Sequence, residues 1–337
     1  MTVRIDIHMM YRTLAEVPDV VRTAERLGVD GVWVSETAHD PFLGAALAAE
    51  HSARLLVGTG VAIAFTRSPT VLAHLAYDLA EASRGRFVLG LGTQVRAHIV
   101  RRYGLTWDAP AARLRDVVGA VRAVWEAWRT GAPLAYRGRY YTLTLMTPAF
   151  CPAPHPYPIP IMTAGVNPRM CQVAGEVADG FLVHPLHTRG YLTDVIRPAL
   201  ARGRARGGRP DPCPVVASVL VGVGESATAV RDAAARVRER IAFYASTPSY
   251  RRVLDHHGWG ELGVRLRTLA ARGAWAEMGT LIPDEILHEV AVVGGPEDAG
   301  DRLRERYRGL ADRVVLDGPP LPGREDVWRA LLDRCRA

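Results

Sequence analysis

The chain of 337 residues contains no lysine, so all 42 of its basic residues are arginine. Without lysine there is no Schiff-base nucleophile, no lysine general base and no P-loop lysine, which excludes most barrel aldolases and P-loop enzymes. The formal net charge of +7 would suit a polyanionic small molecule. Nucleic-acid binding is not expected, because the arginines alternate with acidic residues in stretches such as RDAAARVRER and form no basic stripe.

Cysteine is scarce and scattered, at positions 151, 171, 213 and 335, with no CxxC pair. This pattern is typical of reduced thiols in a cytoplasmic protein and predicts neither a disulfide framework nor a zinc site. No apolar run approaches the roughly 18–20 residues of a membrane helix. The chain begins with a strand-like segment, so we also expect no signal peptide. His184 and His187 lack a third ligand at metal-like spacing, so no metal site is expected.

The sequence instead shows a regular alternation of strand and helix patterns. Strand-like runs lie at 3–9, 31–35, 55–65, 86–91, 159–163, 180–183, 215–223 and 313–316. Helical patterns lie near 14–27, 43–52, 69–83, 110–130, 168–178, 190–206, 225–244, 296–308 and 324–335. Eight strand–helix steps predict an α/β protein with a (β/α)8 TIM barrel, and a doubly wound open sheet is the alternative.

Two segments depart from this alternation within one domain that we expect to span residues 1–337. Residues 134–158 predict a short hairpin around Arg137-Gly138 after the fourth helix, followed by a proline-rich crossing. Residues 245–290, after the seventh strand, are too long for a loop and carry helical patterning. Long insertions after barrel strands commonly form lids or pocket walls, which is the role we expect here.

Parallel barrels place their sites beyond the carboxyl ends of the strands, where this chain has several polar residues. Glu36 and His39 follow the second strand and could supply acid–base chemistry, although Glu36 could also simply pair with an arginine. Arg67 follows the third strand and could clamp an anion or brace a neighbouring loop. Thr93 and Gln94 follow the fourth strand at the same end of the barrel.

The loop after the fifth strand predicts an anion site. It contains Thr163, Ala164, Gly165, Val166 and Asn167, and a helix begins after it at Pro168. Glycine permits close approach of the backbone to a ligand, and free N–H groups at a helix start attract anions. The alternative is an ordinary helix start.

Several motifs together carry a family resemblance over nearly the whole chain. They are AERLGVDGVWVSE, GTGVAIAFTRSP, GRFVLGLGTQ, RGRYYTL, PIMTAGVNPRM and GEVADGFLVHP. In this order they resemble the bacterial luciferase-like monooxygenase superfamily and, within it, the deazaflavin (coenzyme F420)-dependent oxidoreductases. ETAHDPFL, AFYASTPSYRRVL and HGWGEL resemble a mainly actinobacterial subgroup of those oxidoreductases.

The resemblance implies where a cofactor would lie. Members carry a non-proline cis peptide in the third strand, here expected at Gly60-Val61, which forms a bulge behind the central ring of the cofactor. The phosphate would lie at 163–167, and contacts to the ring edge and tail would come from Glu36, Thr93, Gln94 and Arg67, with His184 a further candidate. Related dehydrogenases have an Asp-His pair after the second strand, where this chain has Glu36 and Thr37, with His39 two residues further on.

The function implied is hydride transfer between reduced F420 and an activated C=C, C=N or C=O of a small-molecule or peptide substrate. His39 and Glu36 are the leading proton donors, followed by His184 and Tyr244. Substrate-wall residues in or beside the insertion would be Tyr244, Tyr250, His257 and Trp259. An FMN-dependent two-component monooxygenase is one alternative, and a non-catalytic flavin-binding carrier or sensor is another. A homodimer is also expected from the resemblance.

Overall fold

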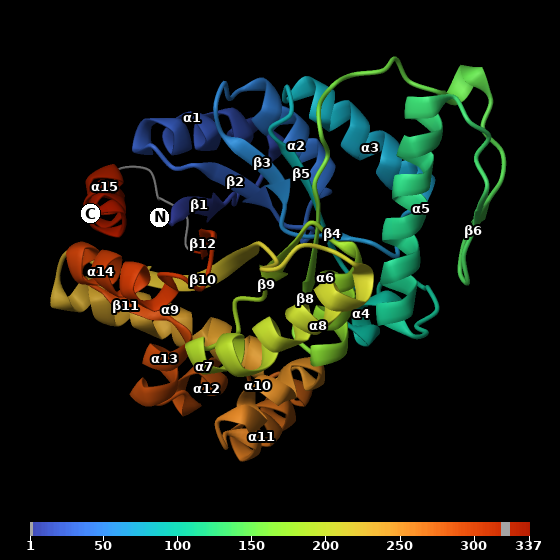
Figure 1. Ribbon diagram of the computed structural model, residues 1–337. Coiled ribbons are helices and arrows are strands. Elements are labelled where there is room, and N and C mark those ends of the chain that lie inside the picture. The colour runs from blue at the N-terminus through green and yellow to red at the C-terminus, as the bar shows by residue number, and fades with distance from the viewer. Residues whose placement is uncertain (1–2, 318–323) are drawn as a thin grey trace.

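The computed structural model describes residues 3–317 and 324–337, and its centre is a closed barrel of parallel strands (Figure 1). In spatial order the barrel strands are β1 (Arg4–His8), β2 (Gly31–Val34), β3 (Leu56–Thr59), β5 (Phe87–Gly92), β8 (Ile161–Gly165), β9 (Gly180–Val183), β10 (Val215–Val223) and β12 (Arg313–Asp317). β12 pairs with β1 and closes the ring. The predicted (β/α)8 barrel is therefore confirmed over the open-sheet alternative.

Helices surround the barrel at the predicted places. They are α1 (Val17–Leu27), α2 (Pro41–Glu50), α3 (Pro69–Ala82), α5 (Pro110–Thr130), α6 (Pro168–Val177), α8 (Arg197–Gly207), α14 (Pro296–Tyr307) and α15 (Glu325–Arg336). Three of them, α2, α3 and α6, begin at proline after a polar residue. In α3 the Ser68 hydroxyl accepts a hydrogen bond from the Val71 N–H at 3.2 Å. A short helix α4 (Arg96–Arg101) after β5 was not predicted, and α7 (Arg189–Tyr191) leads into a π-helical turn before α8.

The interior of the barrel is apolar in its middle and charged near the amino ends of the strands. Trp33 lies in a cluster with Val88, Leu182, Val216 and Val315. Below it the Arg313 guanidinium donates two hydrogen bonds to the Asp6 carboxylate, at 2.6 and 2.5 Å. The Trp33 indole N–H donates to the same carboxylate at 2.8 Å. This contact joins β1, β2 and β12 across the closure of the barrel.

The third predicted strand, 55–65, is interrupted in the structure. β3 ends at Thr59, a non-proline cis peptide joins Gly60 to Val61, and β4 (Ala62–Ile63) then pairs with β5. The predicted position of the cis peptide is confirmed. Glycine is needed at position 92 because a Cβ there would lie 2.5 Å from the Cγ2 atom of Val61.

A large segment stands outside the barrel repeat between β10 and α14. It contains α9 (Ala227–Ala245), α10 (Arg251–His256), α11 (Gly260–Ala271), α12 (Trp275–Met278), α13 (Asp284–Val290) and β11 (Val292–Gly294), which pairs with the end of β10. We call residues 227–294 the insertion. The insertion has its own hydrophobic core, built around residues such as Ile241, Leu254 and Leu266. Figure 1 shows α10–α13 gathered at one side of the barrel beside α7.

This insertion is longer than the predicted span of 245–290. The helix predicted at 225–244 is α9, and it packs into the core of the insertion. The place of the seventh barrel helix is taken by α14, which packs extensively against α15. The long strand β10 extends past the barrel and carries the chain to this second layer.

The predicted hairpin is confirmed as β6 (Tyr136–Arg137) and β7 (Thr142–Leu143), which lies on the outer side of α5 (Figure 1). The Asp116 carboxylate on α5 holds it, accepting from the Tyr136 hydroxyl at 2.5 Å and from the Tyr140 N–H at 2.6 Å. Among the described residues, no helix has the length and apolarity needed to cross a membrane.

Candidate functional site

The carboxyl ends of the barrel strands form a mouth, where buried strand residues give way to half-buried ones. Gly60 and Val61 are half-buried between fully buried neighbours on both sides. The same change occurs at Thr93, Gln94, Ala164, Gly165 and His184. These predicted candidates are therefore partly exposed at the carboxyl ends of their strands. Thr163 differs, because it is completely buried and its hydroxyl has no partner among the described residues.

A directed chain of hydrogen bonds lies beneath Gly60. The Ser35 hydroxyl donates to the Gly60 carbonyl oxygen at 2.8 Å and lies 3.4 Å from Nδ1 of His8. Nε2 of His8 lies 3.3 Å from the Ser218 hydroxyl. Because burial lowers the pKa of His8, the ring is neutral, which fits Nδ1–H donating to Ser35 and Nε2 accepting from Ser218. The chain fixes the Gly60 carbonyl from below.

Sequence reasoning missed His8, Ser35 and Ser218. A signal for His8 was present in the segment RIDIH, where the polar residues Asp6 and His8 alternate with isoleucines. In a strand covered by helices, alternating polar residues must face the barrel interior.

Glu36 forms part of a buried ion cluster with Arg67. Its Oε2 atom accepts a hydrogen bond from Arg67 at 2.8 Å and another from the Ile63 N–H at 2.7 Å. Arg67 also donates to the Asp40 carboxylate at 2.5 Å. The side chains of Glu36 and Arg67 are only 7% and 14% exposed. Both therefore brace the segment around β4, and the Asp40 carboxylate additionally caps α2 by accepting from the Phe42 N–H.

His39 lies apart from this cluster. Its Nε2 atom is 2.9 Å from the Arg12 carbonyl oxygen, and its ring stacks on Tyr11 with a centroid distance of 5.2 Å. A carbonyl oxygen only accepts, so Nε2 carries a proton and Nδ1 is the atom left for other partners. Among the hydrogen bonds of the described residues, none joins His39 to another predicted site residue.

The loop after β8 touches the insertion. The Asn167 amide donates to the Ser249 carbonyl oxygen at 3.1 Å, and the Tyr191 hydroxyl donates to the Val166 carbonyl oxygen at 3.1 Å. Asn167 precedes the first turn of α6 in extended conformation, and the exposed Arg169 lies in that turn. A helix start with an adjacent arginine is suited to a phosphate.

A cluster of aromatic rings and one ion pair lies where α9 meets the mouth. The His184 ring is 4.8 Å from Tyr244 and 4.2 Å from Tyr250, measured between centroids. The Arg240 guanidinium donates to both carboxylate oxygens of Asp317, at 2.7 and 2.6 Å, and to the Tyr244 hydroxyl at 3.2 Å. We call these five residues the mouth cluster. Sequence reasoning missed Arg240 and Asp317, which contact each other across 77 residues of chain.

The neutral state of His184 follows from its surroundings. Burial, with the nearby His187, lowers the pKa of His184 to about 3. The Leu186 N–H donates to Nδ1 at 3.0 Å, so the single ring proton lies on Nε2. Burial also raises the pKa of Tyr250 to about 12 and raises that of Tyr244. At neutral pH all three rings are uncharged hydrogen-bond donors.

The other predicted wall and ring-edge residues have local partners. Nε2 of His257 lies 2.7 Å from the Thr188 hydroxyl, and the His257 ring stacks on Trp259 at a centroid distance of 4.4 Å. The contact between His257, which follows α10, and Thr188, which precedes α7, holds these two helices together. Gln94 has a positive φ of 59°, and its side-chain oxygen accepts from the Val95 N–H at 2.9 Å.

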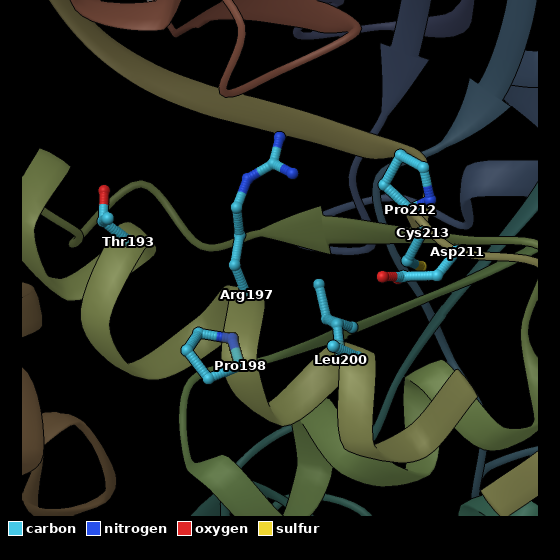
Figure 2. Close-up of a pocket in the computed structure, with 8 residues that line it drawn as sticks. Thr193, Arg197, Pro198, Leu200, Asp211, Pro212 and Cys213 are labelled. Atoms are coloured by element: carbon cyan, nitrogen blue, oxygen red, sulfur yellow. The ribbon is translucent and has the colours of Figure 1, made fainter. Parts of the chain in front are cut away.

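A cavity of about 220 Å³ lies away from the mouth, beside α8 (Figure 2). Its lining includes Arg197 and Leu200 on the helix and the loop Asp211–Cys213, which precedes β10 and so belongs to the amino ends of the strands. Figure 2 shows these side chains facing one another across the gap. None of the predicted site residues lines this cavity. Among residues 3–317 and 324–337, no group of three His, Cys, Asp or Glu side chains is arranged to hold a metal ion.

The chain is similar to known proteins over most of its length. The family described as luciferase-like monooxygenase matches residues 2–313. An uncharacterized protein of Mycobacterium tuberculosis is 46% identical over 304 residues, which cover 90% of this chain and 89% of that protein. An F420-dependent glucose-6-phosphate dehydrogenase of Nakamurella multipartita is 31% identical over 208 residues, covering 58% of this chain and 59% of that enzyme.

A solved structure supports the fold. The coenzyme F420-dependent tetrahydromethanopterin reductase of Methanopyrus kandleri superposes with a TM-score of 0.80 at 21% identity. The superposition covers 98% of this chain and 97% of that one.

Proposed function

We propose that this chain, which belongs to the luciferase-like monooxygenase family, is a coenzyme F420-dependent oxidoreductase. The observation that carries the proposal is the surface at the mouth formed by Gly60, Val61 and Ala164, with the buried Gly92 against the Val61 side chain. Gly60 and Val61 are half-buried between β3 and β4, Ala164 is half-buried in β8, and none of the four residues is larger than valine. Such a surface suits one face of a flat ring system. The relative from Nakamurella multipartita named as F420-dependent adds support for this cofactor.

Close packing leaves no room for larger residues at this surface. A Cβ atom at Gly92 would lie 2.5 Å from the Val61 side chain, and one at Gly60 would lie 3.1 Å from Cβ of Trp33. Larger residues at either position would raise or tilt the surface. We infer that Gly60 and Val61 support the ring and that Ala164–Asn167, with the start of α6, holds the phosphate.

We infer that the remaining candidates lie around this surface. Arg67, Thr93, Gln94 and His184 would contact the ring edge or tail, while the buried Thr163 would support the phosphate loop from below. When bound, the deazaflavin accepts or supplies a hydride at C5. Glu36 would act by holding Arg67 and β4 in place, since its Oε2 atom is already engaged by both. His39, through Nδ1, and His184, through Nε2–H, remain candidates for holding a proton near the substrate.

Cofactor titration tests the proposal directly. The purified apo-protein is titrated with F420 and, separately, with FMN, and binding is followed by fluorescence. We expect F420 to bind more tightly, and Gly92→Ala to weaken F420 binding about tenfold or more through displacement of Val61. Gly295→Ala is the matched control, because its Cβ would meet no atom within 4 Å.

Each other result points to a different function. Preferential binding of FMN would favour a two-component monooxygenase on the same barrel. Binding of F420 without hydride transfer to enones, imines, ketones or dehydroamino acid peptides would favour a carrier or sensor. The proposal also includes a small-molecule or peptide substrate, a homodimer and a cytoplasmic location, and light scattering of the purified protein tests the dimer.

A further inference from the structure

The Tyr244 hydroxyl has an unusual set of neighbours. It accepts a hydrogen bond from Arg240 at 3.2 Å, and Arg240 is held by two hydrogen bonds to Asp317, which is only 6% exposed. A guanidinium has donors only, so the hydroxyl must be the acceptor in this contact. The proton of Tyr244 therefore points elsewhere, and no acceptor for it is found among the described residues.

The two neighbouring rings share this property. The ring proton of His184 lies on Nε2, for which the described residues offer no acceptor, and the same is true of the Tyr250 hydroxyl. Half-buried donors without acceptors are costly unless water or a ligand accepts from them. The three rings that carry these donors lie together, with centroid distances of 4.2 to 6.5 Å, on the side of the mouth formed by α9 and the end of β9.

The charges at this place select the kind of acceptor. Arg240 and Asp317 neutralise each other through a bidentate contact, so the mouth cluster presents no net positive charge. A carboxylate or phosphate would gain little here, whereas a neutral oxygen or nitrogen acceptor would satisfy the donors without adding charge.

We propose that Tyr244 donates its proton to a neutral carbonyl oxygen or imine nitrogen of the substrate, with Arg240 and Asp317 as positioning residues. The inference rests on the proposed function, because it requires a reduced deazaflavin as the hydride source. For a ketone, the carbonyl carbon accepts the hydride and the C–O π electrons take the proton of Tyr244, giving an alcohol. The tyrosinate left beside Arg240 regains a proton from water at the mouth.

The first test needs no cofactor. Protein labelled with 13C at Cζ of tyrosine is titrated with cyclohexanone and, as the anionic probe, with cyclohexanecarboxylate. The Tyr244 resonance is assigned by its loss in Tyr244→Phe, which keeps the ring contact with His184. We expect it to shift with cyclohexanone and to stay unchanged with the carboxylate. An unchanged resonance with cyclohexanone, or an equal response to the carboxylate, overturns the inference.

The second test measures turnover of cyclohexanone with reduced F420. We expect Tyr244→Phe to lower kcat about 100-fold with unchanged affinity for F420. Tyr140→Phe is the control, since it removes a phenol hydroxyl from the remote hairpin. Normal kcat in Tyr244→Phe overturns proton donation. If the wild-type protein does not bind F420, the proposed function fails. In that case, or if the wild-type protein does not reduce cyclohexanone, proton donation in turnover is overturned, and the resonance shift decides only whether Tyr244 binds a neutral carbonyl oxygen.

Discussion

At the scale of single residues, Glu36 separates a structural role from a catalytic one. Its carboxylate is almost fully buried and accepts from Arg67 and from the Ile63 N–H. Glu36→Gln keeps an acceptor for that N–H but leaves the Arg67 charge with Asp40 alone. Because removing one partner of a buried pair is costly, we expect a loss of about 2–3 kcal/mol in the free energy of unfolding, measured with urea.

A surface pair supplies the control for this change. Arg329 and Asp326 are paired at 3.1 Å with the Asp326 side chain 93% exposed, so Asp326→Asn should cost less than about 0.5 kcal/mol. If Glu36→Gln abolished turnover with F420 while leaving the unfolding curve in place, Glu36 would be a catalytic base and the bracing role assigned above would be wrong.

His187 links stability to pH. Burial lowers its pKa to about 4, and it is held by the His184 carbonyl oxygen at 2.8 Å and the Tyr307 hydroxyl at 3.0 Å. The unfolded chain binds this proton near pH 6.5, whereas the folded chain resists it. The stability contribution of His187 is thus complete above pH 6.5 and is lost as pH falls toward 4, by up to about 3 kcal/mol.

Urea unfolding at pH 7.5, 6.5, 5.5 and 4.5 measures this dependence. His187→Asn is expected to flatten the decline between pH 6.5 and 4 relative to the wild-type protein, whatever its effect at pH 7.5. An equally steep decline in the variant would mean that His187 is protonated in the folded state, contrary to its burial.

At the scale of elements, the insertion should open independently of the barrel. Leu266 is completely buried in the core of the insertion, which is separate from the core around the barrel. Leu266→Ala creates a cavity that costs about 2–5 kcal/mol. We expect faster amide hydrogen exchange in 227–294, with β1, β2 and β12 still protected. Leu316→Ala, equally buried but in β12, should instead raise exchange across the barrel.

The elements also show how far sequence patterns reach. Alternation of strands and helices predicted the barrel, because each step is encoded locally by apolar runs and by signals such as Ser68-Pro69. The pattern at 225–244 predicted a helix correctly but not its place, since an amphipathic helix can cover a barrel or join a second core. In the structure β10 has nine residues against four to six in the other barrel strands, and its end pairs with β11 beyond the barrel.

Some site residues could be placed from the sequence, and others could not. Gly60 and Val61 could be placed from sequence because their position within a strand and a family motif coincide. The partners of Glu36 and Arg240 could not, since Arg67 lies 31 residues from Glu36 and Asp317 lies 77 residues from Arg240. Such contacts depend on which strand ends meet at the mouth, and only barrel closure determines this.

At the scale of the whole molecule, a buried contact between Asp6 and Arg313 supports the strand pairing that closes the barrel. Their side chains are 0% and 8% exposed, and the contact joins the first and last strands. Arg313→Met leaves the buried Asp6 carboxylate with the Trp33 N–H as its only side-chain donor among the described residues. We expect the free energy of unfolding to fall by about 3–5 kcal/mol at pH 8, measured by urea unfolding with tryptophan fluorescence.

The pH dependence of this loss identifies its cause. Burial raises the pKa of Asp6 even beside Arg313, and removing the guanidinium, which lowers this pKa, raises it further. A folded pKa above the unfolded value of about 3.9 means that the native variant binds a proton that the unfolded chain releases. The free energy of unfolding that Arg313→Met loses relative to the wild-type protein should therefore become smaller as pH falls from 8 toward 5. Adding Asp6→Asn to Arg313→Met should recover stability at pH 8 and remove this pH dependence. A deficit in Arg313→Met that stayed constant with pH would instead indicate lost packing of the arginine side chain.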